Sequence, residues 1–354
     1  MRAVPWDALA GLSETVVPAI ARVLEGAPAE REIDLLLRAD RTLGKAQRAA
    51  TVEAIFGVGL WRRRLAVHTA SSEPTALLFG LLRDLAGVPE ERAAALTALP
   101  PPFPPRFPPP RRIADRWSYP DWIEAVFLRE LGVGAEALAA AMCAPGPICL
   151  RANALRTDRK ELARLLEAEG VATRPGRYAR DALVLTTARP NLLALGSYRE
   201  GLFEVQDEAS QLVAQLVQAR PGETVLDFCA GAGGKTLALA GAMRGRGRLF
   251  AWDPDAERLR RLGERARRAG ATVEIGREVE ADAVLADVPW LIHATCTFRR
   301  EENEDVALAF ERAHPELRRL SPDLPAELLR DGFLRTWPHL HDTDGFFASV
   351  WRKI

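Results

Sequence analysis

The sequence predicts a multidomain protein with an all-α N-terminal module, a small α+β domain and a C-terminal α/β domain. The chain has 354 residues, too many for a typical single domain. Apolar residues recur at helical spacing from residue 8 to about 98. From residue 224 onward, near-continuous apolar strands alternate with amphipathic helices, which predicts a parallel sheet covered on both faces.

Composition sets limits on charge and compartment. Lys+Arg and Asp+Glu are both 48, so contact with nucleic acid would depend on local basic patches rather than on a global field. The four cysteines form no C-x-x-C pair, which favours a reducing compartment over structural zinc or disulfides. No apolar run reaches membrane-spanning length, and the N-terminus lacks a signal-peptide core. We therefore expect a soluble, cytoplasmic protein that neither binds a metal nor contacts a membrane.

Residues 1–98 form the predicted helical module. Asp40 begins a capping signal for a helix that runs to Arg64, where Arg62, Arg63 and Arg64 place cations in the last turn. These three arginines are candidate RNA contacts. A plain scaffold bundle is the alternative interpretation.

A proline-rich stretch, residues 99–117, marks a predicted domain boundary. It contains LPPPFPPRFPPP, in which nearly every residue is proline or precedes one, so neither a helix nor a central strand can form. We expect a stiff, extended linker.

Two further domains are predicted. Residues 118–200 read as a small α+β domain, and residues 201–354 as the α/β domain. The α+β domain has predicted helices at 118–131, 135–141 and 158–169 and strands at 148–153 and 182–186. The α/β domain has predicted strands at 201–205, 224–228, 248–252, 272–275, 283–287, 291–295, 333–336 and 346–351, with helices at 207–218, 235–243 and 255–269.

The α/β domain is organised around TVLDFCAGAGGKT, residues 224–236. A buried strand there runs through a glycine-rich turn into a helix, and such turns bind nucleotide-like ligands because glycines admit the ligand closely and the helix offers free N–H groups. The spacing is neither that of a P-loop nor G-x-G-x-x-G. Asp253 ends the next strand, where an acid can bind ribose hydroxyls. S-adenosylmethionine is therefore the leading ligand.

Two residues at strand ends are candidates for chemistry. Asp287 ends the strand at 283–287, and Cys296 follows the strand at 291–295, so both are expected at the sheet edge that carries the glycine turn. A cysteine between a strand and the acid-rich helix start at 301–304 is positioned as a nucleophile. A buried structural cysteine is the alternative.

Six segments of the chain together resemble the RsmB/Sun family of RNA (cytosine-5) methyltransferases. They are RANALRTDRKEL, EGLFEVQDEASQLVA, DFCAGAGGKT, ADVP, HATCTFRREENEDV and DTDGFFASVWRK. The N-terminal helices, with RADRTLGKAQRAATVEAIFGVGLWRRR, resemble the NusB-like RNA-binding domain of members that act on small-subunit ribosomal RNA. The resemblance implies a Rossmann-like class I methyltransferase domain, S-adenosylmethionine as cofactor and ribosomal RNA as partner, and we expect a monomer.

The resemblance also assigns roles to residues. Cys296 matches the family's nucleophile, whose thiolate attacks C6 of cytosine, and Asp287 matches the carboxylate that contacts N3 and the amino edge of the base. Asp253 matches the ribose acid. The cofactor-binding candidates are Cys229, Ala230, Gly231, Gly233, Gly234, Lys235, Asp253 and Asp287. Further RNA-binding candidates are Arg151, Asn153, Arg299 and Arg300, the last two as phosphate contacts at what is otherwise a solvated helix start.

Three features depart from the family pattern. The glycine turn has Gly-Ala where the family has Ala-Pro, and the acid expected after the third strand is missing at Gly276-Arg277. Trp290 stands after Pro289, where the family has a second cysteine that helps release the product.

The same region is too short for the predicted topology. Only residues 288–290 separate two predicted parallel strands, yet parallel neighbours need a crossover of about a dozen residues or more. We therefore expect residues to be missing between Pro289 and Leu291, including the second cysteine and a crossover helix. If none is missing, the sheet cannot close normally and turnover would be impaired.

Three functions follow as hypotheses. The first is S-adenosylmethionine-dependent formation of 5-methylcytosine in small-subunit ribosomal RNA through a Cys296–C6 adduct. The alternatives are a catalytically impaired RNA-binding or ribosome-assembly protein and a tRNA cytosine-5 methyltransferase. His339 and His341, followed by Asp342 and Asp344, could suggest a metal, but a polar turn is the favoured interpretation.

Overall fold

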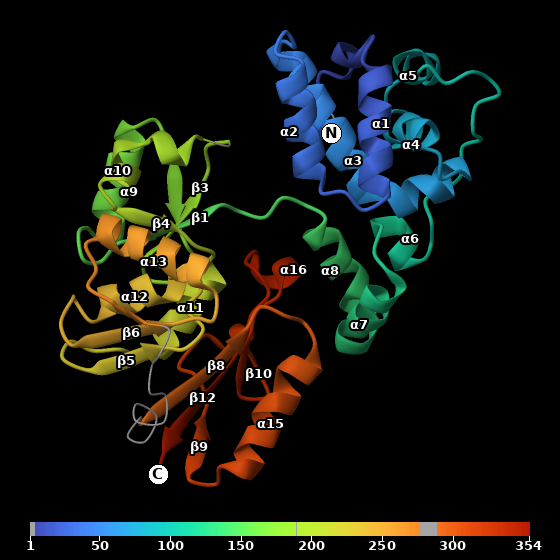
Figure 1. The fold of residues 1–354 in the computed structure, drawn as a ribbon. Coiled ribbons are helices and arrows are strands. Elements are labelled where there is room, and N and C mark those ends of the chain that lie inside the picture. The colour runs from blue at the N-terminus through green and yellow to red at the C-terminus, as the bar shows by residue number, and fades with distance from the viewer. Residues whose placement is uncertain (1–3, 189, 277–288) are drawn as a thin grey trace. The chain divides into compact units, whose positions relative to one another are not determined.

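The computed structural model describes residues 4–188, 190–276 and 289–354 (Figure 1). Two compact units, Met1–Ala139 and Ala140–Ile354, make up the chain, and each is described by itself. This division differs from the predicted boundaries at 98, 117 and 200. In the described chain, no helix combines the length and apolar character needed to cross a membrane.

The first unit is helical throughout its described residues, as the spacing of apolar residues predicts. The long helix α3 contacts α1, α2, α4 and α6 and buries Ala54, Ile55, Val58 and Leu65 completely. The elements are η1 (Trp6–Leu9), α1 (Ser13–Leu24), α2 (Ala29–Ala39), α3 (Lys45–Thr69), α4 (Pro74–Gly80), η2 (Leu81–Leu85), α5 (Glu90–Thr97), α6 (Ile113–Trp117), α7 (Asp121–Leu131), η3 (Gly132–Gly134) and the start of α8 (Ala135–Met142).

The proline-rich segment packs against this unit instead of separating two domains. Phe103 stacks on Phe79 with ring centroids 5.6 Å apart. The side chain of Arg83 is fully buried and donates hydrogen bonds to the carbonyls of Pro104 and Pro105. A proline-rich segment has few N–H groups of its own to pair its carbonyls, and the guanidinium supplies the missing donors. The chain therefore returns to helix within the same unit.

The second unit begins with a four-stranded antiparallel sheet of order β2-β3-β1-β4. Leu150, Leu162, Leu166 and Phe203 form its core. The elements are β1 (Cys149–Ala152), α9 (Arg159–Ala168), β2 (Thr173–Pro175), β3 (Ala182–Leu185), η4 (Leu192–Ala194), α10 (Gly196–Arg199) and β4 (Phe203–Val205). The predicted strands at 148–153 and 182–186 are present.

Helix α11 (Glu208–Leu216) leads into a parallel sheet of order β5-β6-β7. Its elements are β5 (Thr224–Asp227), α12 (Gly234–Ala242), β6 (Arg248–Trp252), α13 (Ala256–Ala269) and β7 (Glu274–Gly276), close to the predicted ranges. Leu237 of α12 and Leu262 of α13 pack with Ala251 of β6, so both helices cover the same face of the sheet.

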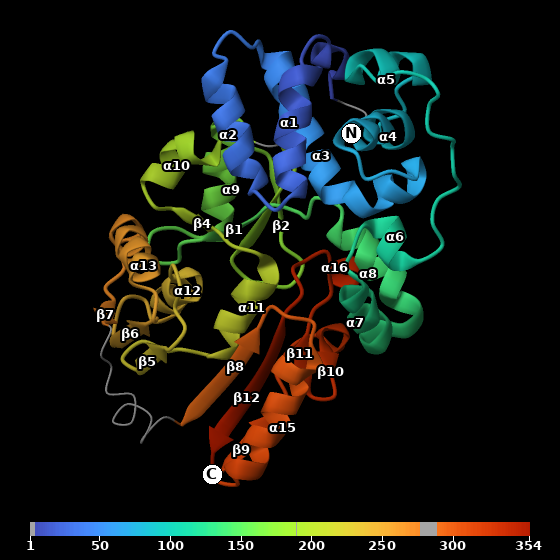
Figure 2. The same cartoon turned by 45° about the vertical axis from the view of Figure 1, so that its right-hand side comes forward.

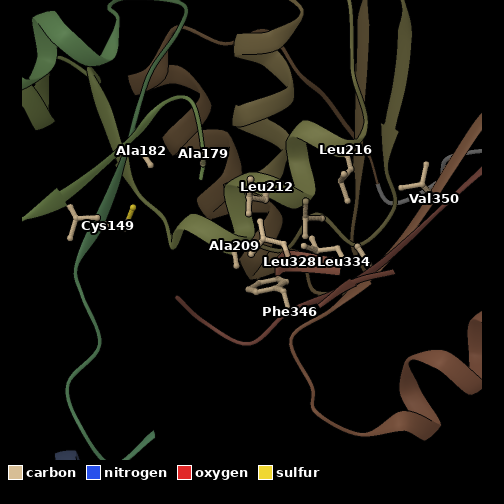
Figure 3. Packing of buried hydrophobic residues seen from close by; sticks show 13 residues of the cluster. Cys149, Ala179, Ala182, Ala209, Leu212, Leu216, Leu328, Leu334, Phe346 and Val350 are labelled. Carbon is tan, nitrogen blue, oxygen red and sulfur yellow. The ribbon is translucent and has the colours of Figure 1, made fainter. Parts of the chain in front are cut away.

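The C-terminal part is an antiparallel sheet of order β10-β11-β12-β8, with β9 also paired to β12 (Figure 2). Its elements are β8 (Trp290–Thr295), η5 (Arg300–Glu302), α15 (Glu304–Ala313), β9 (Leu317–Leu320), η6 (Ala326–Leu328), β10 (Leu329–Arg330), β11 (Phe333–Arg335), α16 (Pro338–His341) and β12 (Phe347–Lys353). Leu212 and Leu216 of α11 pack against Leu334 and Val350 of this sheet (Figure 3). The predicted antiparallel closing strands are therefore present.

The predicted single sheet, covered on both faces, stays a prediction, because its strand at 283–287 lies outside the described residues. Within them, β5 pairs with β6 alone and β8 pairs with β12 alone. A cavity of about 1140 Å³ lies between β5 and β8. Phe250 points away from α12 and α13 and lines this cavity, and Phe228 is 45% exposed. Among the described residues, one edge of β5, one edge of β8 and one apolar sheet face thus have no partner.

Replacement of Arg83 should destabilise the first unit. Arg83 pairs with Asp84 at 2.7 Å, and both side chains are buried. Arg83→Leu leaves Asp84 buried without its cation, so we expect unfolding free energy to fall by about 3–5 kcal/mol. Urea denaturation of the full chain measures this. Arg92→Leu is the control, because its pair with Asp7 is exposed and is worth about 0–1 kcal/mol; equal losses would contradict the structural role of Arg83.

Intact-mass measurement of the purified protein tests for the missing crossover. We expect a mass above the 38.9 kDa calculated from the sequence, by more than about 1 kDa, because a crossover needs about a dozen residues or more. Peptide mapping should find a cysteine-containing peptide between Pro289 and Leu291. A mass of 38.9 kDa would show instead that β5 and β8 keep their open edges.

Candidate active site

The glycine turn after β5 adopts backbone angles that favour glycine. Gly231 has φ +53° and Gly233 has φ +87°, both in the left-handed region. A Cβ at Gly233 would lie 2.7 Å from Cγ of Leu262 on α13, whereas one at Gly231 would meet nothing within 4 Å. The turn is therefore packed tightly on one side and open on the other.

Asp253 fastens this turn to the second strand. Its Oδ2 accepts a hydrogen bond from the Gly231 N–H at 2.9 Å, and its Oδ1 accepts one from the Asp255 N–H at 3.0 Å. Asp253 is 5% exposed. Asp253, the predicted ribose-binding residue, therefore also has a structural role, because each of its carboxylate oxygens accepts a hydrogen bond from a backbone N–H.

A second carboxylate lies under the turn. Asp227 accepts a hydrogen bond from the hydroxyl of Thr236 at 2.7 Å, and burial raises the pKa of the Asp227 carboxyl. Lys235, at the start of α12, has its Nζ 5.3 Å from the ring centroid of Phe346. The two predicted cofactor residues Gly234 and Lys235 thus begin the helix that follows the turn.

An arginine that the sequence did not single out supports the turn from α13. Arg265 donates a hydrogen bond to the carbonyl of Ala232 at 2.7 Å and pairs with Glu204 at 2.7 Å. Glu204 lies on β4, is almost fully buried and also pairs with Arg268. This network connects the antiparallel sheet to the glycine turn. The only sequence signal is the spacing of Arg265 and Arg268 on one helix face.

The predicted RNA contacts Arg151 and Asn153 are corrected by their burial, at 4% and 3% exposed. Asn153 donates hydrogen bonds to the carbonyls of Gly201 and Ala269. Burial lowers the pKa of the Arg151 guanidinium to about 10, with nearby Glu204 opposing the shift. Both side chains are buried inside the second unit, so neither is exposed for direct contact with RNA.

The remaining arginine candidates lie at or near the surface. Arg299 lies within 4 Å of Glu301 and Glu302, and Arg300 pairs with Asp305 at 3.0 Å. All of these side chains are about half exposed, where ion pairs are weak and phosphate can compete.

In the helical unit, two of the three predicted arginines have structural partners. Arg63 pairs with Asp115 and Asp121 at 2.7 Å, and Arg64 donates a hydrogen bond to the carbonyl of Arg116. These contacts hold α6 and the start of α7 against α3. Arg62 is exposed and stays an RNA-contact candidate.

Cys296 lies at the carboxyl end of β8 and is exposed. The next residues are fixed from the C-terminal sheet: Phe298 stacks on Trp337 at 5.3 Å with ring planes 6° apart, and its carbonyl accepts a hydrogen bond from Arg335 at 3.0 Å. The thiol therefore stands on a short, well-held loop.

The other cysteines have less suitable surroundings for a thiolate. Burial, Asp227 and Asp253 raise the pKa of the Cys229 thiol. Cys149 is buried, and this burial raises the pKa of its thiol strongly. A raised pKa makes the Cys229 thiolate less accessible, so Cys229 is less suited to act as a nucleophile.

Two expectations concern residues around the short connection. Asp287 lies outside the described residues. Trp290, which follows Pro289 where the family has its second cysteine, starts β8, and Cys296 follows the end of that strand. Six steps along a strand span about 20 Å. Trp290 is therefore remote from Cys296 and occupies the second cysteine's place in the sequence only.

His341, the second of the two histidines near the C-terminus, has backbone partners. In His341, Nδ1 accepts a hydrogen bond from the Trp337 N–H at 2.8 Å, and Nε2 lies 3.0 Å from the carbonyl of Glu327. Burial lowers the pKa of this imidazole, which keeps it neutral. Both ring nitrogens are used to hold the turn around α16.

Comparison with known proteins gives two matching family domains. The "Methyltr_RsmF/B-like, ferredoxin-like domain" matches residues 119–191, and "16S rRNA methyltransferase RsmB/F" matches residues 214–289. The chain is 28% identical over 311 residues to "Probable ribosomal RNA small subunit methyltransferase B" of Bacillus subtilis, covering 69% of this chain and 68% of that protein. Both matched domains are of the RsmB/F type, which supports the predicted resemblance to the RsmB/Sun family.

Other relatives match over shorter parts. "Ribosomal RNA small subunit methyltransferase B" of Pseudomonas putida is 32% identical, over 64% of this chain and 51% of its own. "28S rRNA (cytosine-C(5))-methyltransferase" of Mus musculus is 26% identical, over 59% and 35%. The chain thus spans about half or less of these two relatives. The match to the RsmB/F domain ends at Pro289, where the predicted gap begins.

Solved structures agree on the fold. The crystal structure of PH0851 has a TM-score of 0.75 and 19% identity over the whole of both chains. NSun6 from Pyrococcus horikoshii with SFG has a TM-score of 0.59 and 17% identity, over 66% of this chain and 98% of its own. The chain therefore shares its fold with these two structures.

Substitution of Gly233 should cost more than its backbone angle alone. Gly170 has a similar φ of +80° with nothing within 4 Å of a built Cβ. We expect Gly170→Ala to lower unfolding free energy by about 1–2 kcal/mol, and Gly233→Ala by about 1–3 kcal/mol more because of Leu262. Urea denaturation of both variants measures the difference. Equal losses would show that α13 yields to the added methyl group.

Proposed function

We propose that this protein is an S-adenosylmethionine-dependent methyltransferase that forms 5-methylcytosine in small-subunit ribosomal RNA. The observation that carries the proposal is the pairing, within one α/β domain, of a glycine turn held by Asp253 with an exposed cysteine at the carboxyl end of β8. The two matched RsmB/F-type domains, and the names of the curated relatives, support the same reaction and substrate class.

The residues of the turn suit S-adenosylmethionine. The side of Gly231 is open, the start of α12 supplies N–H groups, and Asp227 and Asp253 place negative charge beside the turn. We assign the cofactor to Cys229, Ala230, Gly231, Gly233, Gly234, Lys235 and Asp253, with Asp253 on the ribose. When bound, the cofactor supplies the methyl group that cytosine C5 accepts.

Cys296 supplies the covalent step. C5 of cytosine is a poor nucleophile, so the Cys296 thiolate first adds to C6, which gives C5 enamine character. Asp287, at the N3 and amino edge of the base, favours charge build-up during this attack. After C5 has accepted the methyl group, loss of its proton breaks the Cys296–C6 bond and returns the thiolate. The second cysteine, which we place in the missing segment, assists this release.

RNA binding is assigned to two places. Arg299 and Arg300, just past Cys296, are positioned to contact phosphate groups beside the target base. The N-terminal helical unit, which we propose to be NusB-like, binds RNA through a surface that includes Arg62. Cytoplasmic location and a monomeric state accompany this assignment.

A catalytically impaired RNA-binding protein is the second candidate. The open edges of β5 and β8 and the remoteness of Trp290 from Cys296 favour it if the sequence is complete. Such a protein would bind ribosomal RNA without transferring methyl groups. A tRNA methyltransferase shares all of the site chemistry and is distinguished by assaying tRNA beside ribosomal RNA.

Replacement of Cys296 should abolish methyl transfer and spare cofactor binding. We expect Cys296→Ala to transfer no methyl group from labelled S-adenosylmethionine to small-subunit ribosomal RNA, because no adduct at C6 can form. Calorimetric binding of S-adenosylmethionine should stay within about twofold of wild type. Cys143→Ala is the matched control and should keep full activity. Full activity of Cys296→Ala would overturn the proposed mechanism.

A further inference from the structure

The buried side chain of Asn303 forms hydrogen bonds to the residues on both sides of Cys296, the proposed nucleophile. The side-chain amide of Asn303 accepts a hydrogen bond through Oδ1 from the hydroxyl of Thr295 and donates one through Nδ2 to the carbonyl of Thr297 at 2.9 Å. Thr295 and Thr297 are the two neighbours of Cys296 in the chain. Asn303 is 0% exposed, so water does not compete for either hydrogen bond. A single planar amide thus holds both flanks of the exposed cysteine.

The backbone of Asn303 is itself fixed. Its N–H donates a hydrogen bond to the carbonyl of Arg300 at 3.0 Å, and its carbonyl accepts one from the Ala307 N–H at 3.0 Å. Asn303 therefore joins η5 to the first turn of α15. On the opposite side, Ala307 packs with Phe347 of β12, the strand that pairs with β8. The amide is held by the same layer of structure that carries the cysteine.

The residue type matters as much as the position. The contact needs one acceptor facing Thr295 and one donor facing Thr297, which an amide supplies and a carboxylate does not. Aspartate has the same shape but would turn a second acceptor toward the Thr297 carbonyl, in a buried place where charge is costly. Alanine removes both contacts.

We infer that Asn303 is a positioning residue that holds Cys296 where its thiolate meets C6 of the target pyrimidine. The catalytic part of this inference rests on the proposed function. The clamp, meaning the two hydrogen bonds of Asn303 to Thr295 and Thr297, can be measured independently of that function. Attack on C6 needs the sulfur within a few tenths of an ångström of one place, and misplacement by about 1 Å can cost about 100-fold in rate. The clamp therefore acts on the covalent step and leaves RNA and cofactor binding unchanged.

The kinetic test compares four variants of the full chain. Asn303→Asp should lower kcat about 100-fold with KM for RNA changed less than about twofold. Thr295→Val removes the hydroxyl donor and should act in the same direction, whereas Thr295→Ser keeps it and should restore activity. Asn153→Ala is the matched control: it removes a buried asparagine amide that bridges two carbonyls in the same unit but does not touch the cysteine loop.

Hydrogen–deuterium exchange tests the clamp independently of activity. In Asn303→Asp, backbone amides of residues 296–299 should exchange at least about tenfold faster than in wild type, because the hydrogen bond to the Thr297 carbonyl is lost and a carboxylate oxygen faces that carbonyl instead. Asn153→Ala should leave these amides unchanged. Unchanged exchange in Asn303→Asp would overturn the clamp, and faster exchange with unchanged kcat would overturn the positioning role. A wild-type protein without methyl transfer would overturn the proposed function instead, while exchange still decides the clamp.

Discussion

The connection between two neighbouring parallel strands must be long enough to return from the end of the first strand to the start of the second. The second unit depends on this constraint. β8 begins at Trp290, one residue after Pro289, and carries Cys296 at its far end. Because β8 begins directly after Pro289, no chain is left there for a crossover to a parallel neighbour. Among the described residues, β5 and β8 each have one unpaired edge, and Phe228 and Phe250 line the cavity between them.

The cofactor side of the site is unaffected by this short connection. β5, α12, β6 and α13 are consecutive, and their connections are of ordinary length. Asp253 ties the turn to β6, and Arg265 ties it through Glu204 to the antiparallel sheet. This explains why the α+β and α/β parts, predicted as separate domains, form one compact unit. Loss of the crossover would thus impair base chemistry before cofactor binding.

Local patterns predicted most of the elements. The strands around 224–228 and 248–252 and the helices after them are strongly periodic, and the structure has them within two residues of the predicted ends. Local periodicity could not predict which groups the polar side chains bond to. The Asn153 amide donates a hydrogen bond to the Ala269 carbonyl, 116 residues away in the chain. Nothing near Asn153 in the sequence therefore distinguishes it from a surface residue. The proline-rich segment is extended, as predicted, but its partner Arg83 could not be identified from the sequence because it lies about 20 residues upstream.

The same distinction applies to the site. Cys296 and the glycine turn could be found because their chemistry is carried by the residues themselves. Asn303 and Arg265 act through neighbours, and only coordinates reveal which neighbours those are. Asn303 was visible merely as one residue of an acid-rich helix start.

Electrostatics separates the roles of the two exposed cysteines. Cys229 lies beside Asp227 and Asp253, and these carboxylates help raise the pKa of its thiol, because they disfavour a second negative charge there. For the same reason they favour a positive charge, and under the proposed function the cofactor brings one as its sulfonium. Cys296 stands on another strand, on a loop held by the Asn303 amide and by the Arg335 guanidinium. Negative charge under the turn therefore serves the methyl donor, and the site needs its thiolate elsewhere, which is where the Asn303 clamp holds it.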